Sequence, residues 1–410
     1  MDHRVMRTRY GISPWIDTFP RSRRPEHPRL RGEHTAEVAI IGGGLTGCAT
    51  AYACALAGLR PILIEADRLG QGRTGRSAGL LLPEPGPDFR DLAKMHGLRT
   101  ARRMFEGWRR ASLDGAGLLR RLGIPCGLEA SQSLTVAFGD EEKALLRECQ
   151  ARKEAGLDAH WANRAAVSKA ASLDAAAGLR LGGCFALDPY RACLGLASAA
   201  VKRGAILFEH TAVRKVRAGS RHVEIAVDGG MVRAGTVIVC TGTATAEYKP
   251  LRRHFKRREK YLVLTEPVPP AVRRQLGDRA LTVGDVATPR HRIRWTQDNR
   301  LLVAGADQPE TPVRKREGVL VQRTGQLMYE LLRMYPAISG LQAVYGWESV
   351  YGETSDGVTY IGPHRNYPRH LFALGGGADS VTGAFLAARV LTRAASGKLD
   401  KDDEVFGWTR

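Results

Sequence analysis

Short β-rich runs alternate with an apolar, helix-compatible run near the start of the chain. Residues 37–41 form such a β-rich run, and three consecutive glycines at 42–44 interrupt the pattern directly after it. Residues 45–56 suit a buried helix that ends near Gly58, a plausible C-cap. A second apolar strand follows at 61–65. The pattern predicts a strand, a turn, a helix and a second strand, which together make a βαβ unit.

The glycines of this unit are spaced as G-x-G-x-x-G at Gly42, Gly44 and Gly47. In a dinucleotide-binding turn, the first glycine permits the sharp bend, the second lets the backbone approach a pyrophosphate, and the third lets the helix pack on the strand. Glu65, which lies 21 residues beyond Gly44, ends the second strand, where a carboxylate can accept hydrogen bonds from ribose hydroxyls. We expect a dinucleotide site here; the alternative is a purely structural glycine turn.

Four later segments resemble the D-amino-acid/glycine/sarcosine oxidase family of FAD-dependent oxidoreductases. They are QGRTGRSAG at 71–79, LDPYR at 187–191 with the strand into Val213, AGTVIVCTG at 234–242, and WESVYGETSDGVTYIGP at 347–363. The N-terminal SPW at 13–15 and PRL at 28–30 look like the γ-glutamylputrescine-oxidase-like branch. Thr74, Ser77 and Cys240 depart from the usual family residues.

The resemblance implies FAD rather than NAD as the cofactor. A helix that starts after the glycine turn at 375–377 and runs to about Thr392 is expected to point its N-terminus at the flavin, where the family usually has Gly-His-x-Gly and this chain has Ala378, Asp379 and Ser380. The cofactor contacts implied by the glycine loop and by the resemblance are Gly42, Gly44, Leu45, Thr46, Gly47, Glu65, Ala66, Arg73, Thr74, Ser77, Ala78, Gly79, Val213, Thr241, Gly242, Asp379, Ser380, Val381 and Thr382.

The family fold implied is α/β, with a Rossmann-like FAD-binding domain assembled from discontinuous segments and an α+β substrate domain with a mainly antiparallel sheet. We expect residues 1–34 to be an N-terminal extension. The FAD-binding domain would comprise 35–92, 158–250 and 340–410, and the substrate domain 93–157 and 251–339. Strands are expected at 260–265, 293–295 and 301–304, the last closed by Gly305, and amphipathic helices with a basic outer face over 93–122.

The activity implied is oxidation of the C–N bond of a small amine or amino acid by hydride transfer to flavin N5, giving an imine that hydrolyses. Tyr351 stands where the glycine-oxidase branch has its carboxylate-binding arginine, and Arg292 and Arg294 are candidates for a displaced clamp, with Arg290 beside them. A surface position for these arginines is the alternative. Alternation along a strand puts Arg292 and Arg294 on one face.

Covalent attachment of the flavin is not expected. Ser349 stands where the sarcosine-oxidase branch has its attaching cysteine, and the sequence has no cysteine beyond Cys240, so we expect non-covalent FAD. The oxygen-activating lysine of some amine oxidases has no recognisable counterpart near residues 301–304, which leaves O2 or another electron acceptor open.

Composition and the first residues of the chain bear on metal binding, disulfides and location. Seven cysteines without a C-x-x-C pair predict neither a disulfide framework nor a metal site, and the absence of an apolar leader in the first 34 residues favours the cytoplasm. The uncharged stretch 38–59 reads as strand, turn and buried helix, so no integral membrane segment is expected.

The net charge of +20 is spread over the chain, which favours a solvated basic surface over a nucleic-acid site. A tRNA-directed flavoenzyme stays an alternative. A non-catalytic flavoprotein or electron-transfer subunit is another, suggested by the altered turn at 379–380. Oligomeric state is open.

Overall fold

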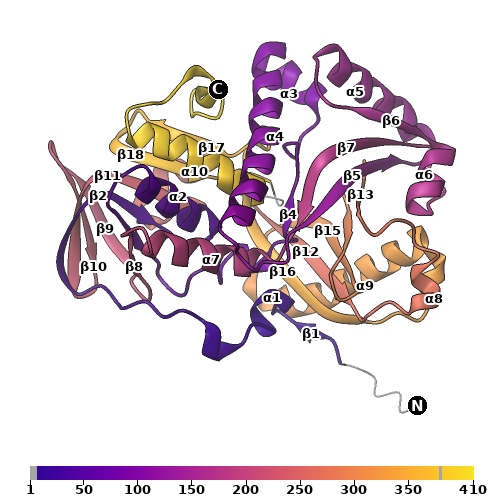
Figure 1. Ribbon diagram of the computed structural model, residues 1–410, viewed down its shortest axis with the longest axis horizontal. Coiled ribbons are helices and arrows are strands. Elements are labelled where there is room, and N and C mark those ends of the chain that lie inside the picture. Colours follow the sequence, from indigo (N-terminus) through magenta and orange to yellow (C-terminus); the bar gives the residue numbers. More distant parts are fainter. Residues whose placement is uncertain (1–6, 378–380) are drawn as a thin grey trace.

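The computed structural model describes residues 7–377 and 381–410. Within these ranges the chain forms two large sheets that lie next to each other, with helices packed on both (Figure 1). No helix in the described part is long and apolar enough to span a bilayer, and the uncharged stretch 38–59 is divided among a strand, a turn and a helix.

The sheet drawn at the left of Figure 1 contains eight strands from the described residues. Their order is β17 (Tyr360–His364), β18 (Tyr367–Leu374), β11 (Gly230–Gly242), β2 (Gly32–Ile41), β3 (Pro61–Ile64) and β8 (Ile206–Phe208), with β10 (Val223–Val227) paired to β11 and β9 (Val213–Ala218) paired to β10. The pairings from β18 through β8 are parallel. Against this sheet lie α2 (Leu45–Leu56), α7 (Pro189–Val201) and α10 (Val381–Ala395), which contact one another side by side. The βαβ unit predicted from the glycine-interrupted pattern is therefore present.

The second sheet has ten strands in the described residues. Their order is β1 (Arg9–Tyr10), β16 (Ala343–Glu353), β12 (Lys256–Thr265), β15 (Leu301–Pro309), β14 (Arg292–Trp295), β13 (Leu281–Asp285), β5 (Glu129–Ala137), β7 (Ala177–Ala186) and β4 (Leu80–Leu81), with β6 (His160–Asn163) paired to β7. Only the β1–β16 and β5–β13 pairings are parallel among these described strands.

The remaining helices cover the second sheet and the junction between the sheets (Figure 1). They are α1 (Pro14–Asp17), α3 (Phe89–His96), α4 (Leu98–Arg121), α5 (Glu142–Glu154), α6 (Arg164–Ala171), α8 (Pro270–Arg273), α9 (Arg316–Met334) and α11 (Lys401–Glu404). Short 3-10 turns occupy Arg21–Arg23, Thr74–Arg76, Gly139–Glu141, Ala246–His254, Val313–Lys315 and Pro336–Ile338. On α4, Met104 and Trp108 are buried while Arg102 and Arg110 are exposed, as expected of an amphipathic helix with a basic outer face.

The expected α/β fold with a second, mainly antiparallel sheet is confirmed. One strand boundary was wrong: Gly305 does not close its strand, because β15 continues its pairing with β12 as far as Pro309. The division into a cofactor domain and a substrate domain stays a prediction. Strands β4, β7 and β16, from segments expected in the cofactor domain, are members of the ten-stranded sheet.

A charged contact fastens α9 to the second sheet. His291 Nδ1 lies 2.7 Å from Asp285 at the end of β13, and His291 Nε2 lies 2.7 Å from Glu330 on α9. Only the imidazolium can donate from both nitrogens at once. Burial lowers the pKa of His291, but the hydrogen bonds and charges of the two carboxylates outweigh it, so the pKa is raised overall.

Candidate active site

A cavity of about 530 Å³ opens where β2 and β3 end in Ile41 and Ile64. Thirteen of the predicted cofactor residues line it: Gly42, Gly44, Leu45, Thr46, Glu65, Ala66, Arg73, Thr74, Ser77, Val213, Thr241, Gly242 and Val381. Segments far apart in the sequence thus meet at one place, the carboxyl edge of a parallel sheet, where α/β folds bind nucleotides.

The glycine loop forms a tight cradle at one end of this cavity. A Cβ on Gly42 would lie 2.7 Å from the carbonyl oxygen of Cys240, and a Cβ on Gly47 would lie 1.9 Å from the carbonyl oxygen of Gly42. Gly42 also has φ of +108°, a conformation that favours glycine. Because no larger residue fits at either position, the first turn of α2 rests directly on the loop. The N–H groups that begin this helix have no acceptor within the helix, and that of Thr46 is suited to an anion.

Glu65 and Thr74 hold the loop in place from the other side. Glu65 accepts hydrogen bonds from the backbone N–H of Gly43 at 2.6 Å and of Asp67 at 2.9 Å, and Thr74 Oγ1 accepts one from Leu45 N–H at 2.8 Å. The Glu65 carboxylate still faces the cavity, where a ribose diol can donate to it. Steric fit, free helix N–H groups and this carboxylate together suit the pyrophosphate and ribose of FAD.

The other predicted cofactor residues lie just behind the cavity wall or outside the described ranges. Gly47 packs within the loop, and a Cβ on Gly79 would lie 2.2 Å from the carbonyl oxygen of Leu187. Ala78 is buried, and Thr382 Oγ1 donates to the carbonyl oxygen of Leu82 at 2.9 Å. Asp379 and Ser380, like Ala378 before them, lie outside the described residues.

A second cavity, of about 680 Å³, adjoins the first and contains Tyr351 and Arg292. Arg73, which lines the cofactor cavity, donates to the carbonyl oxygen of Gly377, and its guanidinium carbon lies 5.8 Å from the ring centroid of Tyr351. Gly377 and Tyr351 both line the second cavity. Arg73 therefore spans the place where the two cavities meet.

Next to Arg73, a tyrosine and an aspartate form a polar pair in the second cavity. Tyr351 Oη donates to Asp307 Oδ1 at 2.7 Å. Burial raises the pKa of Tyr351, and the negative charge of Asp307 raises it further, so the phenol keeps its proton and continues to donate. Sequence reasoning missed Asp307 because the strand was expected to end at Gly305. Continued pairing of β15 with β12 carries Asp307 to the cavity, whose lining also includes the buried Lys260 and the partly buried Arg258, both of them missed as well.

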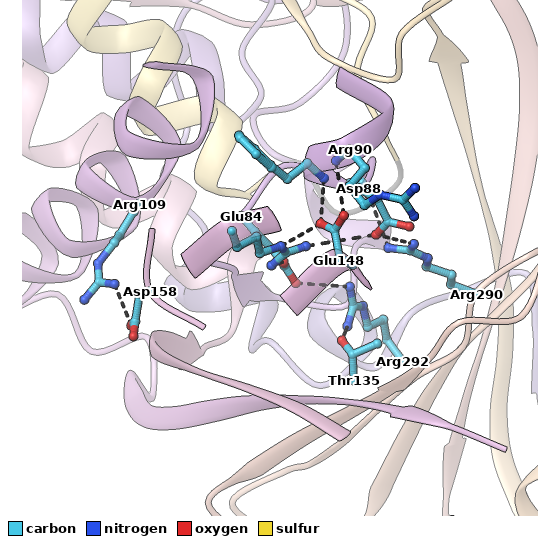
Figure 2. A network of polar contacts seen from close by, with 12 residues as sticks. Glu84, Asp88, Arg90, Arg109, Thr135, Glu148, Asp158, Arg290 and Arg292 are labelled. Carbon is cyan, nitrogen blue, oxygen red and sulfur yellow. Dashed lines mark hydrogen bonds and ion pairs between the residues drawn. The ribbon is translucent and has the colours of Figure 1, made fainter. Parts of the chain in front are cut away.

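Part of the wall of the second cavity is a network of charged side chains, of which Glu84 and Arg292 are buried (Figure 2). Arg292 lies 3.8 Å from Glu84, and Arg290 lies 2.7 Å from Asp88. Glu84 is in turn bound to Arg152 at 2.5 Å, and Arg152 to Glu148 at 2.7 Å. Both guanidinium groups on this wall are thus held in position by carboxylates.

Arg294 does not lie with Tyr351 and Arg292. Its strand alternates as expected, since Ile293 and Trp295 pack in an apolar cluster and the two arginines occupy the opposite face. The Arg294 guanidinium nevertheless turns to backbone carbonyls, donating to Ala78 at 2.7 Å and to Leu187 at 3.1 Å. It lines a different cavity.

Comparison with known proteins agrees with this geometry. γ-Glutamylputrescine oxidoreductase of Escherichia coli (strain K12) is 27% identical over 391 residues, which cover 90% of this chain and 85% of the relative. Glycine oxidase of Bacillus subtilis (strain 168) is 26% identical over 380 residues, which cover 87% of this chain and 93% of the relative. In fold, the chain resembles glycine oxidase from Geobacillus kaustophilus, with a TM-score of 0.76 at 21% identity over 92% of this chain and 99% of that one.

The family described as DAO, FAD dependent oxidoreductase, matches residues 37–394, which is most of the chain. The match includes the glycine loop, the Glu65 strand and the segment that carries Tyr351. The chain therefore belongs to this family and is an FAD-dependent oxidoreductase.

Proposed function

We propose that this enzyme oxidises the carbon–nitrogen bond of a small amine or amino acid. The observation that carries the proposal is the Asp307 carboxylate, positioned by Tyr351 in the cavity that adjoins the cofactor cavity. A carboxylate there can bind a substrate ammonium group and accept its proton, and an amine must be unprotonated before its carbon–nitrogen bond can be oxidised. The relatives named for amine and amino-acid substrates support the same class.

The lining of the cofactor cavity supports a set of proposed FAD contacts. The N–H group of Thr46 at the start of α2 would bind the pyrophosphate, Glu65 the ribose, and Val213 would lie along the adenine end. We propose that the FAD is not covalently bound. When bound, FAD supplies the hydride acceptor N5.

The protein's own contribution to the reaction is to orient the substrate and limit water. Asp307 and Tyr351 would hold the amine end next to the flavin. Arg292 and Arg290, which line the same cavity, can pair with a carboxylate on the substrate, since a guanidinium presents parallel N–H donors. Trp108 and Leu82 contribute apolar surface to the same cavity. A substrate with both an amine and a carboxylate would pair with both groups of side chains.

The test is an anaerobic screen of amines and amino acids in which reduction is read as loss of oxidised flavin absorbance. Air is then admitted: rapid return of the absorbance identifies an oxidase, and slow return a dehydrogenase with another acceptor. With a substrate found, Asp307→Asn should slow reduction by about tenfold or more, because one charge-assisted hydrogen bond is worth about 1.5–3 kcal/mol. Asp174→Asn, in an exposed pair with Arg164, is the matched control and should be unchanged.

Equal reduction rates in D307N and D174N would contradict the assigned role of Asp307. If no small amine reduces the flavin, and tRNA binds with a steep dependence on salt, the RNA-directed alternative gains support instead.

A further inference from the structure

A third cavity, of about 580 Å³, lies behind the segment that lines the cofactor cavity. Trp15, on α1, donates from Nε1 to the carbonyl oxygen of Ser77 at 3.0 Å, and Arg294 donates from Nε to that of Ala78 at 2.7 Å. Trp15 and Arg294 line the third cavity, whereas Ser77 lines the cofactor cavity. The two cavities therefore share residues 77–78 as a wall. None of the residues lining the third cavity lines the one that holds Tyr351.

The lining of this third cavity is predominantly cationic. Its charged residues from the described ranges are the arginines Arg7, Arg9, Arg191, Arg294 and Arg300 and the acids Glu129, Asp188 and Asp298. The arginines come from the N-terminal segment, from the start of α7, from β14 and from the turn between β14 and β15. Because these segments are distant in sequence, the excess of positive charge arises only when the chain folds.

Arg294 is the most deeply buried of these arginines, at 5% exposure. Three of its five N–H donors go to carbonyl oxygens, those of Ala78, Leu187 and Trp295. Within residues 7–377 and 381–410, no carboxylate lies within ion-pair distance of Arg294. Burial lowers the pKa of Arg294 to about 10, so it remains a cation at neutral pH. Asp188 and Glu129 favour its charged form at longer range, but neither forms an ion pair with it. A buried cation without a directly paired carboxylate is costly, which makes a bound anion favourable.

The three carboxylates of the cavity already have other partners. Asp188 caps α7 by accepting from the backbone N–H groups of Tyr190 and Arg191 at 2.9 and 3.0 Å, and it pairs with the Arg191 guanidinium at 3.3 Å. Asp298 pairs with Arg300 at 2.6 Å, and Glu129 accepts a hydrogen bond from Gln297 at 3.2 Å. The guanidinium carbon of Arg294 lies over the Trp15 ring, 5.3 Å from the ring centroid. A cation–π contact at this distance is favourable, but it adds no full negative charge that could replace an anion.

We propose that this third cavity is a binding site for a small carboxylate- or phosphate-bearing molecule, held by Arg294 together with Arg300 and Arg191. Guanidinium groups match both kinds of anion through paired N–H donors. The site is separate from the catalytic cavity and does not depend on which amine the enzyme oxidises.

The test is calorimetric titration of the FAD-saturated enzyme, at constant ionic strength, with inorganic pyrophosphate and separately with citrate. Saturating FAD keeps pyrophosphate out of the cofactor cavity. We expect saturable millimolar or tighter binding of one probe, and the preferred probe distinguishes a phosphate ligand from a carboxylate ligand. Arg300→Gln should weaken binding about tenfold or more through loss of a charge-assisted hydrogen bond.

Arg164→Gln is the control, because it removes the same charge from an exposed pair with Asp174, outside the third cavity. It should change the affinity by less than about twofold, as only the long-range charge is lost. Arg294→Met tests the buried cation itself; R300Q keeps the test decisive if R294M fails to fold. Failure of both probes to bind, or equal affinity in R300Q and R164Q, would overturn the proposal.

Discussion

Arg152 is expected to contribute more to the free energy of unfolding than an exposed arginine that pairs with a glutamate four residues away on a helix. It lies on α5 with a side chain that is 4% exposed, and it binds Glu84 at 2.5 Å and Glu148, four residues earlier, at 2.7 Å. Glu84 and Glu148 are 6% and 5% exposed. Arg152→Leu would leave these two carboxylates in a region of low polarity without their cation.

Removing one member of a buried charge cluster typically costs about 3–5 kcal/mol, because the remaining charges are neither hydrated nor paired. Glu148 keeps its hydrogen bonds from the N–H groups of Phe89 and Arg90, whereas Glu84 keeps only the longer contact with Arg292 at 3.8 Å, so most of the loss falls on Glu84. With an unfolding entropy of about 2.1 cal/mol/K per residue, a chain of 410 residues should lose about 3.5–6 °C of Tm.

Arg102→Leu is the matched control. Arg102 also pairs with a glutamate four residues away, Glu106, at 2.9 Å, but the two side chains are 53% and 49% exposed. Exposed pairs of this kind contribute about 0.3–0.5 kcal/mol, so Tm should fall by less than about 1 °C. Thermal unfolding of the FAD-loaded variants, followed by circular dichroism, measures both. An equal fall in Tm in R152L and R102L would refute the argument that burial makes the ion pairs of Arg152 more stabilising than an exposed pair.

Three further predictions concern the cofactor and pH. Gly47→Ala should abolish retention of FAD on gel filtration, since its Cβ would lie 1.9 Å from a carbonyl oxygen. The control is Gly325→Ala, in open space on α9, which should stabilise the protein by about 0.5–1 kcal/mol. Retention of FAD by G47A would contradict the tight fit assigned to the glycine loop. The raised pKa of His291 means that its contribution to stability is complete below the ordinary value of 6.5 and is lost as pH rises through the raised value. The free energy of unfolding measured in urea should fall over this pH range in the wild type, and His291→Gln should lack this fall. Denaturation and filtration should release all flavin, because burial raises the pKa of the Cys240 thiol, which lines the cofactor cavity, to about 12 and keeps it protonated; colour retained on the chain would show a covalent bond.

The sequence alone determined the βαβ unit and its place in the fold. Gly42, Gly44 and Gly47 act through backbone geometry that depends on near neighbours in the chain, and the apolar runs on either side of them have periods that specify a helix and two strands. The position of Glu65 follows from the same local frame, because it comes directly after the second strand, β3. The predicted elements are confirmed: α2 lies over the expected residues 45–56.

Only the tertiary structure decided which charged residues share a cavity. Arg292 and Arg294 lie on the same face of one short strand, roughly 6.6 Å apart along it, yet one faces Glu84 and the other the carbonyl oxygens of Ala78 and Leu187. Those partners come from distant segments, and no local pattern says where they lie. Asp307 was missed for the same reason: the length of its strand depends on pairing with β12, a long-range contact that sequence periodicity does not contain.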